Sequence, residues 1–140
     1  MLEELASTFP ILTCILFLPF VGAVVLWLVE DEDMVRTSAL TIALVELALS
    51  VFVLLRFLPD SAAMQFAEHV PWIPALGVSY HLAVDGISVL FVGLTAFLTV
   101  LIVVYSWDTV RHQVKLYMMA LLALETTTMG VFLSIDLILF

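Results

Sequence analysis

Four apolar runs, each about as long as a membrane is thick, constrain the fold of this chain more than any other feature. A helix needs roughly 20 predominantly apolar residues to cross the hydrocarbon core of a bilayer. Such runs occupy residues 9–29, 37–58, 86–107 and 116–135, and a further apolar run begins at 136–140. We therefore predict an all-α integral membrane protein with four transmembrane helices and the start of a fifth, in a single membrane domain over residues 1–140.

The composition agrees with this fold class and excludes several functions. Of the 140 residues, 64% are hydrophobic and 12% are charged, which is outside the range of soluble globular domains. The net charge of −9 comes from scattered acidic residues and from the run Glu30–Asp33, without any Lys/Arg cluster. We therefore expect the lipid bilayer as a partner and no nucleic acid. Cys14 is the single cysteine, which excludes an internal disulfide and a thiolate metal site.

The few cations predict how the chain is oriented in the membrane. Arg36 lies between the first two predicted helices, and Arg111 and Lys115 lie between the last two, whereas Arg56 alone falls on the other side. By the positive-inside rule, both basic loops face the cytoplasm. We therefore predict a multi-pass protein with its N-terminus outside, on the periplasm-like side; in a bacterium, such a helical protein lies in the inner membrane. The acidic N-terminus precedes an apolar run too long for a signal-peptide core, so we expect a retained helix.

The longest connection, residues 59–85, is then predicted to be an external loop. Val78, Tyr80 and Leu82 alternate with other residues in the pattern of a strand, which indicates a short extended segment or a hairpin on the membrane surface. Asp85 directly precedes the third apolar run and is expected to cap that helix. The three histidines, His69, His81 and His112, are dispersed in the sequence, so no metal site is predicted.

Two carboxylates fall in the middle of predicted membrane helices. Glu46 lies in the second and Glu125 in the fourth. A carboxylate at this depth is costly unless it is protonated, paired or hydrated, and by default it marks a functional site. For Glu46 two interpretations stay open: a proton relay, or a protonated side chain hydrogen-bonded to a neighbouring helix. For Glu125 they are a proton relay and a structural role, with the side chain either buried in the bundle or facing a partner subunit. Asp136, on the face of Glu125, and Asp85 are further proton-pathway candidates, although a helix cap or a surface role is open for both.

Polar side chains form a stripe along the third predicted helix. At 100° per residue, five of them fall within one narrow arc, namely Asp85, Ser88, Thr95, Thr99 and Ser106. Small hydroxyl residues favour helix–helix packing, and a water-lined path is the other interpretation. The sequence contains no arrangement for covalent catalysis, hydride transfer or electron transfer, so we predict no catalytic residue, cofactor site or metal ligand.

Two segments resemble a known family. Val70–Leu90, continuing to Tyr105–Trp107, is similar to the PWIP…HLAxDGxS segment of the subunit M family of proton-translocating NADH:quinone oxidoreductase (complex I), called chain 4 in mitochondria. Gly130–Phe140 resembles the GVFLAxDxxLF segment of the same family. The resemblance implies an antiporter-like subunit whose partners are the other membrane-arm subunits. NADH, FMN, Fe–S clusters and quinone are then expected in those partners, with no redox centre in this chain.

The family pattern also affects the candidate residues. Its principal proton-handling groups are a glutamate just beyond the position of Phe140 and lysines on later helices. We therefore expect an N-terminal, split or truncated portion of such a subunit, in which Glu46 and Glu125 are auxiliary candidates. The alternatives are a subunit of an Mrp-type cation/proton antiporter and a structural or assembly helix bundle with no proton role. The sequence leaves open whether H⁺ or Na⁺ moves.

Overall fold

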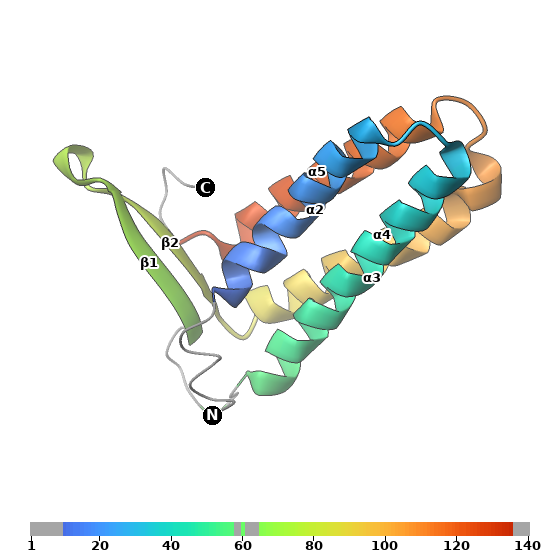
Figure 1. Ribbon diagram of the computed structural model, residues 1–140. Coiled ribbons are helices and arrows are strands. Elements are labelled where there is room, and N and C mark those ends of the chain that lie inside the picture. Colours follow the sequence, from blue (N-terminus) through green and yellow to red (C-terminus); the bar gives the residue numbers. More distant parts are fainter. Residues whose placement is uncertain (1–9, 58–59, 61–64, 136–140) are drawn as a thin grey trace.

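The computed structural model describes residues 10–57, 60 and 65–135 and contains a bundle of antiparallel helices with a β-hairpin at one end. Its helices are α2 (Ile11–Leu28), α3 (Glu32–Arg56), α4 (Ser88–Thr109) and α5 (Val114–Leu133). Each is long and apolar enough to cross a membrane, which confirms the predicted fold class. In Figure 1, α2 lies beside α5 and α3 lies beside α4. The hairpin covers the end where α2 and α4 begin and α3 and α5 end.

The predicted start of the second helix is wrong, because the acidic run opens the helix instead of preceding it. The structure begins α3 at Glu32, not at Thr37. The carboxylate of Asp31 accepts hydrogen bonds from the backbone N–H groups of Asp33 (2.9 Å) and Met34 (3.1 Å). An aspartate is a favoured N-cap, and acidic residues in the first turn interact well with the helix dipole. The other described helix ends differ from the predictions by only a few residues; Phe9, Leu58 and the start of a fifth helix lie outside the described residues.

The extended segment predicted in the loop is a two-stranded antiparallel hairpin. It consists of β1 (Gln65–Ile73), a single 3₁₀ turn (Pro74–Leu76) and β2 (Val78–Val84). Gly77 closes the turn in the left-handed region, at φ 67°, which glycine adopts without a steric cost. Of the alternating residues predicted for β2, Leu82 is fully buried in the core of the bundle and Tyr80 packs against that core.

Two apolar clusters make up the core of the bundle. The hairpin-side cluster includes Val53 of α3, Ala96 of α4 and Met129 of α5, together with Leu82 of the hairpin. The loop-side cluster, toward the short connections α2–α3 and α4–α5, contains other residues of the same three helices (Ala43, Val103 and Leu122 among them). Between the two clusters, each of these helices contributes polar side chains.

Candidate functional site

A polar layer separates the two apolar clusters. We define it by four buried side chains: Glu46 (0% exposed) and Ser50 (0%) of α3, Thr99 (4%) of α4 and Glu125 (2%) of α5. Helix periodicity accounts for this placement. In each helix the buried positions recur every three or four residues, as expected for one packed face, and both glutamates occupy such positions. The packing that buries the apolar neighbours therefore buries the carboxylates too.

The layer holds buried carboxyl and hydroxyl groups that lack hydrogen-bond partners within the described part of the chain. Both carboxylate oxygens of Glu46 and of Glu125, and the Ser50 hydroxyl, have no hydrogen-bond partner among the described residues. The Thr99 hydroxyl, which faces Glu125, donates to the Thr95 carbonyl oxygen at 3.0 Å. Glu46 interacts electrostatically with Glu125 and also with the thiol of Cys14.

No cation of the chain lies at the level of the polar layer. The four Lys and Arg residues are all described and all lie at or near helix ends. Arg56, for example, lies ten residues beyond Glu46 on α3, which corresponds to about 15 Å along the axis. Two buried carboxylates without a counter-charge form a site that favours binding of a positive ion, of which a proton is the simplest.

Asp85 acts as a helix cap, as predicted. Its carboxylate accepts hydrogen bonds from the backbone N–H groups of Ser88 (2.7 Å) and Ile87 (3.0 Å), and its carbonyl accepts from Val89 (3.1 Å). The hydrogen bonds from Ser88, followed by the one from Ile87, hold the pKa of Asp85 below its usual value. The side chain is exposed and remote from the polar layer. Asp136, the other terminal candidate, lies outside the described residues.

The polar stripe of α4 lies partly in the packing interface. Thr99 and Ser106 are buried, Ser88 and Thr95 are half-buried, and Asp85 is exposed. The Ser106 hydroxyl donates to the carbonyl of Ile102 at 2.6 Å and lies 2.8 Å from the Tyr117 hydroxyl of α5. These contacts support the packing interpretation of the stripe at its buried positions.

The hairpin is attached to α2 by residues that sequence reasoning missed. The Glu68 carboxylate accepts hydrogen bonds from the backbone N–H groups of Leu12 (2.7 Å) and Thr13 (3.0 Å) and from the Thr13 hydroxyl. The Tyr80 hydroxyl lies 3.0 Å from the Thr13 hydroxyl oxygen, and burial raises the pKa of Tyr80. The sequence offered only an indirect indication of this contact: the backbone N–H groups in the first turn of any helix have no acceptor within the helix and need one from elsewhere.

Two of the three histidines, although dispersed in the sequence, lie close together in the fold. His69 of β1 and His81 of β2 are direct partners in the hairpin ladder. Their imidazole ring centroids lie 5.0 Å apart, with the ring planes at 89°. They are twelve positions apart in the sequence, and only the register of the hairpin brings them together. Among the described residues, no group of three or more His, Cys, Asp or Glu could hold a metal ion.

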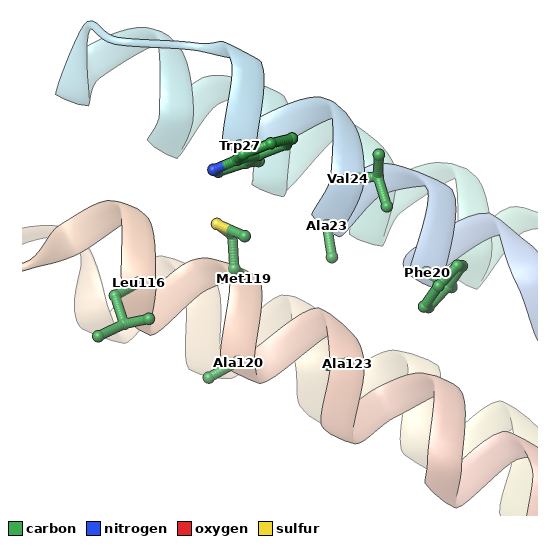
Figure 2. A pocket seen from close by; sticks show the side chains of 8 residues that line it. All are labelled: Phe20, Ala23, Val24, Trp27, Leu116, Met119, Ala120 and Ala123. Atoms are coloured by element: carbon green, nitrogen blue, oxygen red, sulfur yellow. The ribbon is translucent and has the colours of Figure 1, made fainter.

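An apolar groove runs along the outer surface between α2 and α5 (Figure 2). Its volume is about 360 Å³, and its lining is almost entirely apolar. Phe20, Ala23 and Trp27 of α2 face Met119 and Ala123 of α5 across it. A groove of this composition suits a lipid chain or a neighbouring helix and offers nothing to orient a polar substrate.

Comparison with known proteins identifies relatives of this chain. No family model matches it. It is 41% identical to NADH-quinone oxidoreductase subunit M of Rhodobacter capsulatus, over 93% of this chain and 26% of that protein. It is 39% identical to NAD(P)H-quinone oxidoreductase chain 4 2 of Thermosynechococcus vestitus (94% of this chain, 25% of that protein). It is also 32% identical to NADH-ubiquinone oxidoreductase chain 4 of Marchantia polymorpha (100% and 29%).

The chain is a homologue of NADH-quinone oxidoreductase subunit M. This confirms the family resemblance found in the sequence. The chain spans between 25% and 29% of the length of these subunit M and chain 4 relatives. The segment that carried most of the resemblance, Val70–Leu90, contains the end of β1, the turn, the whole of β2 and the start of α4. The second segment, Gly130–Phe140, is described only as far as Ile135, two residues beyond the end of α5.

Proposed function

We propose that this chain is a portion of a subunit M-type protein in the membrane arm of a complex I-type NADH:quinone oxidoreductase, where it contributes to redox-driven proton translocation. The observation that carries the proposal is homology along nearly the whole chain to proteins named as subunits of such oxidoreductases. The buried carboxylates of the polar layer add a physical reason for a translocating role. NADH, flavin, Fe–S clusters and quinone belong to partner subunits in this proposal.

In this function, Glu46 and Glu125 hold a proton near the centre of the bundle. Each carboxylate is closed off from the ends of the bundle by one apolar cluster on either side. A proton held there neutralises the negative charge of a carboxylate that no described Lys or Arg can reach. Asp85 is a weaker candidate because its carboxylate is engaged by backbone N–H groups, and Asp136 stays a candidate on sequence grounds alone.

The proposed orientation has the N-terminus and the hairpin on the periplasmic side of a bacterial inner membrane. Arg36, Arg111 and Lys115 lie at the end of the bundle opposite to the hairpin, and Arg56 lies at the hairpin end. Because three of the four cations lie at the end opposite to the hairpin, the positive-inside rule places that end in the cytoplasm. Other membrane-arm subunits and lipid then cover the apolar outer faces.

The test is proton translocation by the assembled oxidoreductase carrying Glu46→Gln or Glu125→Gln. Glutamine keeps the size of the side chain but cannot release a proton. In inverted membrane vesicles we expect the pH gradient formed per NADH oxidised to fall several-fold in both variants. Glu30→Gln, an exposed residue of the α2–α3 connection, is the matched control and should leave the gradient unchanged.

Two results would argue against the proposal at different levels. Unchanged translocation in both glutamine variants would leave these helices a structural role within the complex. Purification of the chain free of any other oxidoreductase subunit, from a cell that makes the whole complex, would contradict membership of the membrane arm itself.

A further inference from the structure

The histidine pair of the hairpin has the placement of a chelating site. His69 and His81 lie on the face of the hairpin that points away from the bundle, because their neighbours Glu68, Tyr80 and Leu82 point toward it. His69 is exposed and His81 is half-buried. Neither imidazole makes a hydrogen bond or an ion pair within the described part of the chain. The pair is independent of the polar layer, at the other end of the hairpin-side cluster.

From this arrangement we propose that His69 and His81 together bind one divalent transition-metal ion of the class that prefers imidazole, with Zn²⁺ as its first representative. Imidazole nitrogens suit Zn²⁺, Cu²⁺ and Ni²⁺, whereas Mg²⁺ and Ca²⁺ take oxygen ligands. The two histidines supply two ligands, and water fills the remaining positions. The site is therefore an open coordination site, with one protein ligand from each of the two strands.

The separation of the two rings matches a shared metal. A Zn–N bond of about 2.0–2.1 Å places the metal about 3.2 Å from the centre of an imidazole ring. Two imidazoles bound at 90–110° to each other then have centroids about 4.5–5.2 Å apart. The observed centroid separation is 5.0 Å.

The backbone beneath the pair is held in place on both strands. The ladder is regular from Glu68 to Pro71, and its two irregularities fall outside this stretch. On β1, the side chain of Glu68 is fixed by the start of α2. On β2, the carbonyl of His81 accepts a hydrogen bond from the backbone N–H of Ile135 at 3.0 Å. Because the ligands start from a fixed spacing, little ordering cost opposes chelation.

A metal bound here would link β1 to β2. The two strands are joined at one end only, by the 3₁₀ turn, and the hairpin covers one end of the bundle. Anything that binds the folded state alone stabilises it by mass action. We therefore expect Zn²⁺ to slow hydrogen exchange of the ladder amides and to leave that of the α4–α5 end unchanged.

The experiment uses the full chain in detergent micelles, purified without a polyhistidine tag and titrated with ZnCl₂ by calorimetry. We expect one Zn²⁺ per chain, and about tenfold or greater weakening for His69→Asn and for His81→Asn, because each removes one of the two ligands. His112→Asn is the matched control. It removes the third histidine, in the α4–α5 connection, and should bind Zn²⁺ as the unaltered chain does. MgCl₂ should produce no binding.

A spectroscopic readout keeps the proposal testable if one variant loses its fold. With one equivalent of Cu²⁺, the electron paramagnetic resonance of the unaltered chain should show coupling to two equivalent imidazole nitrogens, and that of His69→Asn to one. Circular dichroism checks that each variant keeps its helices. The absence of Zn²⁺ binding, or binding that survives both His69→Asn and His81→Asn, would overturn the site. Neither result bears on the proposed translocating role.

Discussion

Two carboxylates outside the membrane helices accept hydrogen bonds from the first turns of helices and thereby stabilise the helix starts. Asp85 and Glu68 both accept backbone N–H groups from the first turn of a helix, but they reach it differently. Asp85 lies next to the helix that it caps, so the sequence pattern alone predicted its role. Glu68 caps a helix 55 or 56 residues away, and no local pattern indicates that contact. At this scale, sequence predicts interactions between neighbours and misses those created by the fold.

Asp85→Ala should destabilise the start of α4 in a pH-dependent way. Loss of such a cap costs about 1 kcal/mol. The pKa of Asp85 is lowered in the folded state, so its stabilisation is present above the unfolded value of about 3.9 and is lost as the pH falls through the folded value. Thermal unfolding in detergent should therefore show a gap between variant and unaltered chain at pH 7 that closes in acid. Asp85→Asn, which accepts hydrogen bonds but does not titrate, is the control; a gap that persists unchanged in acid would contradict the assignment.

Glu68→Ala should loosen the hairpin from the bundle. The substitution leaves the N–H groups of Leu12 and Thr13 without their acceptor, at a cost of about 1–2 kcal/mol. Hydrogen exchange should accelerate at these two amides and along β1, while α3 and the loop-side ends of the helices stay protected. Glu30→Ala, at an exposed position, should leave the exchange pattern as it is. Equal protection in the Glu68 variant would mean that the hairpin is held by its apolar contacts alone.

At the scale of elements, hydropathy predicted the helices well because lipid-facing and core-facing residues are both apolar. The same fact explains the main error. Hydropathy detects only the apolar part of a helix, so it missed the first five residues of α3, three of which are charged (Glu32, Asp33 and Arg36). The hairpin was predicted from the alternation in β2, whereas β1 has an irregular ladder with two register shifts and gave no clear period. Cross-strand partners such as His69 and His81 follow from register, which the sequence did not fix.

The close approach of α2 and α3 gives a prediction about two glycines. A Cβ atom added at Gly22 would lie 2.7 Å from the Cδ1 atom of Ile42, whereas one added at Gly93 of α4 would meet no atom within 4 Å. The overpacking at Gly22 costs about 1–3 kcal/mol and outweighs a gain in helix propensity of up to about 1 kcal/mol, so Gly22→Ala should lower the free energy of unfolding. Gly93→Ala should be neutral or stabilising by up to about 1 kcal/mol, because alanine favours helix.

Thermal unfolding of the two glycine variants and of the double variant Gly22→Ala/Ile42→Ala provides the measurement. Since Ile42→Ala removes the atoms that the new methyl group would meet, Gly22→Ala should cost much less in that background than in the unaltered chain. The same cost in both backgrounds would place the origin of the effect elsewhere than at this helix contact.

At the scale of the whole molecule, the polar layer is the feature that sequence reasoning reached only in part. The sequence placed Glu46 and Glu125 in the middle of separate helices, and it placed Thr99 on a polar stripe. It could not bring them to one level, because that requires the rotation and the axial offset of three packed helices. Those quantities depend on which residues pack against which, for example on Ala43 and Leu122 in the loop-side cluster. The candidates were therefore predictable, and the layer was not.

The polar layer should make the bundle less stable than an apolar core would. Burying a polar group without a hydrogen-bond partner costs about 1–3 kcal/mol, and more for a charged one, and the layer interrupts what would otherwise be one continuous core. Glu46→Leu and Glu125→Leu should each raise the thermal unfolding temperature of the chain in detergent. Glu30→Leu, at an exposed position, controls for added hydrophobicity and should give no comparable gain.

Lower unfolding temperatures in the leucine variants would mean that the glutamates hold the bundle together. A gain in stability accompanied by lost proton translocation in the assembled complex is the result that we expect, because a site kept for function commonly costs stability.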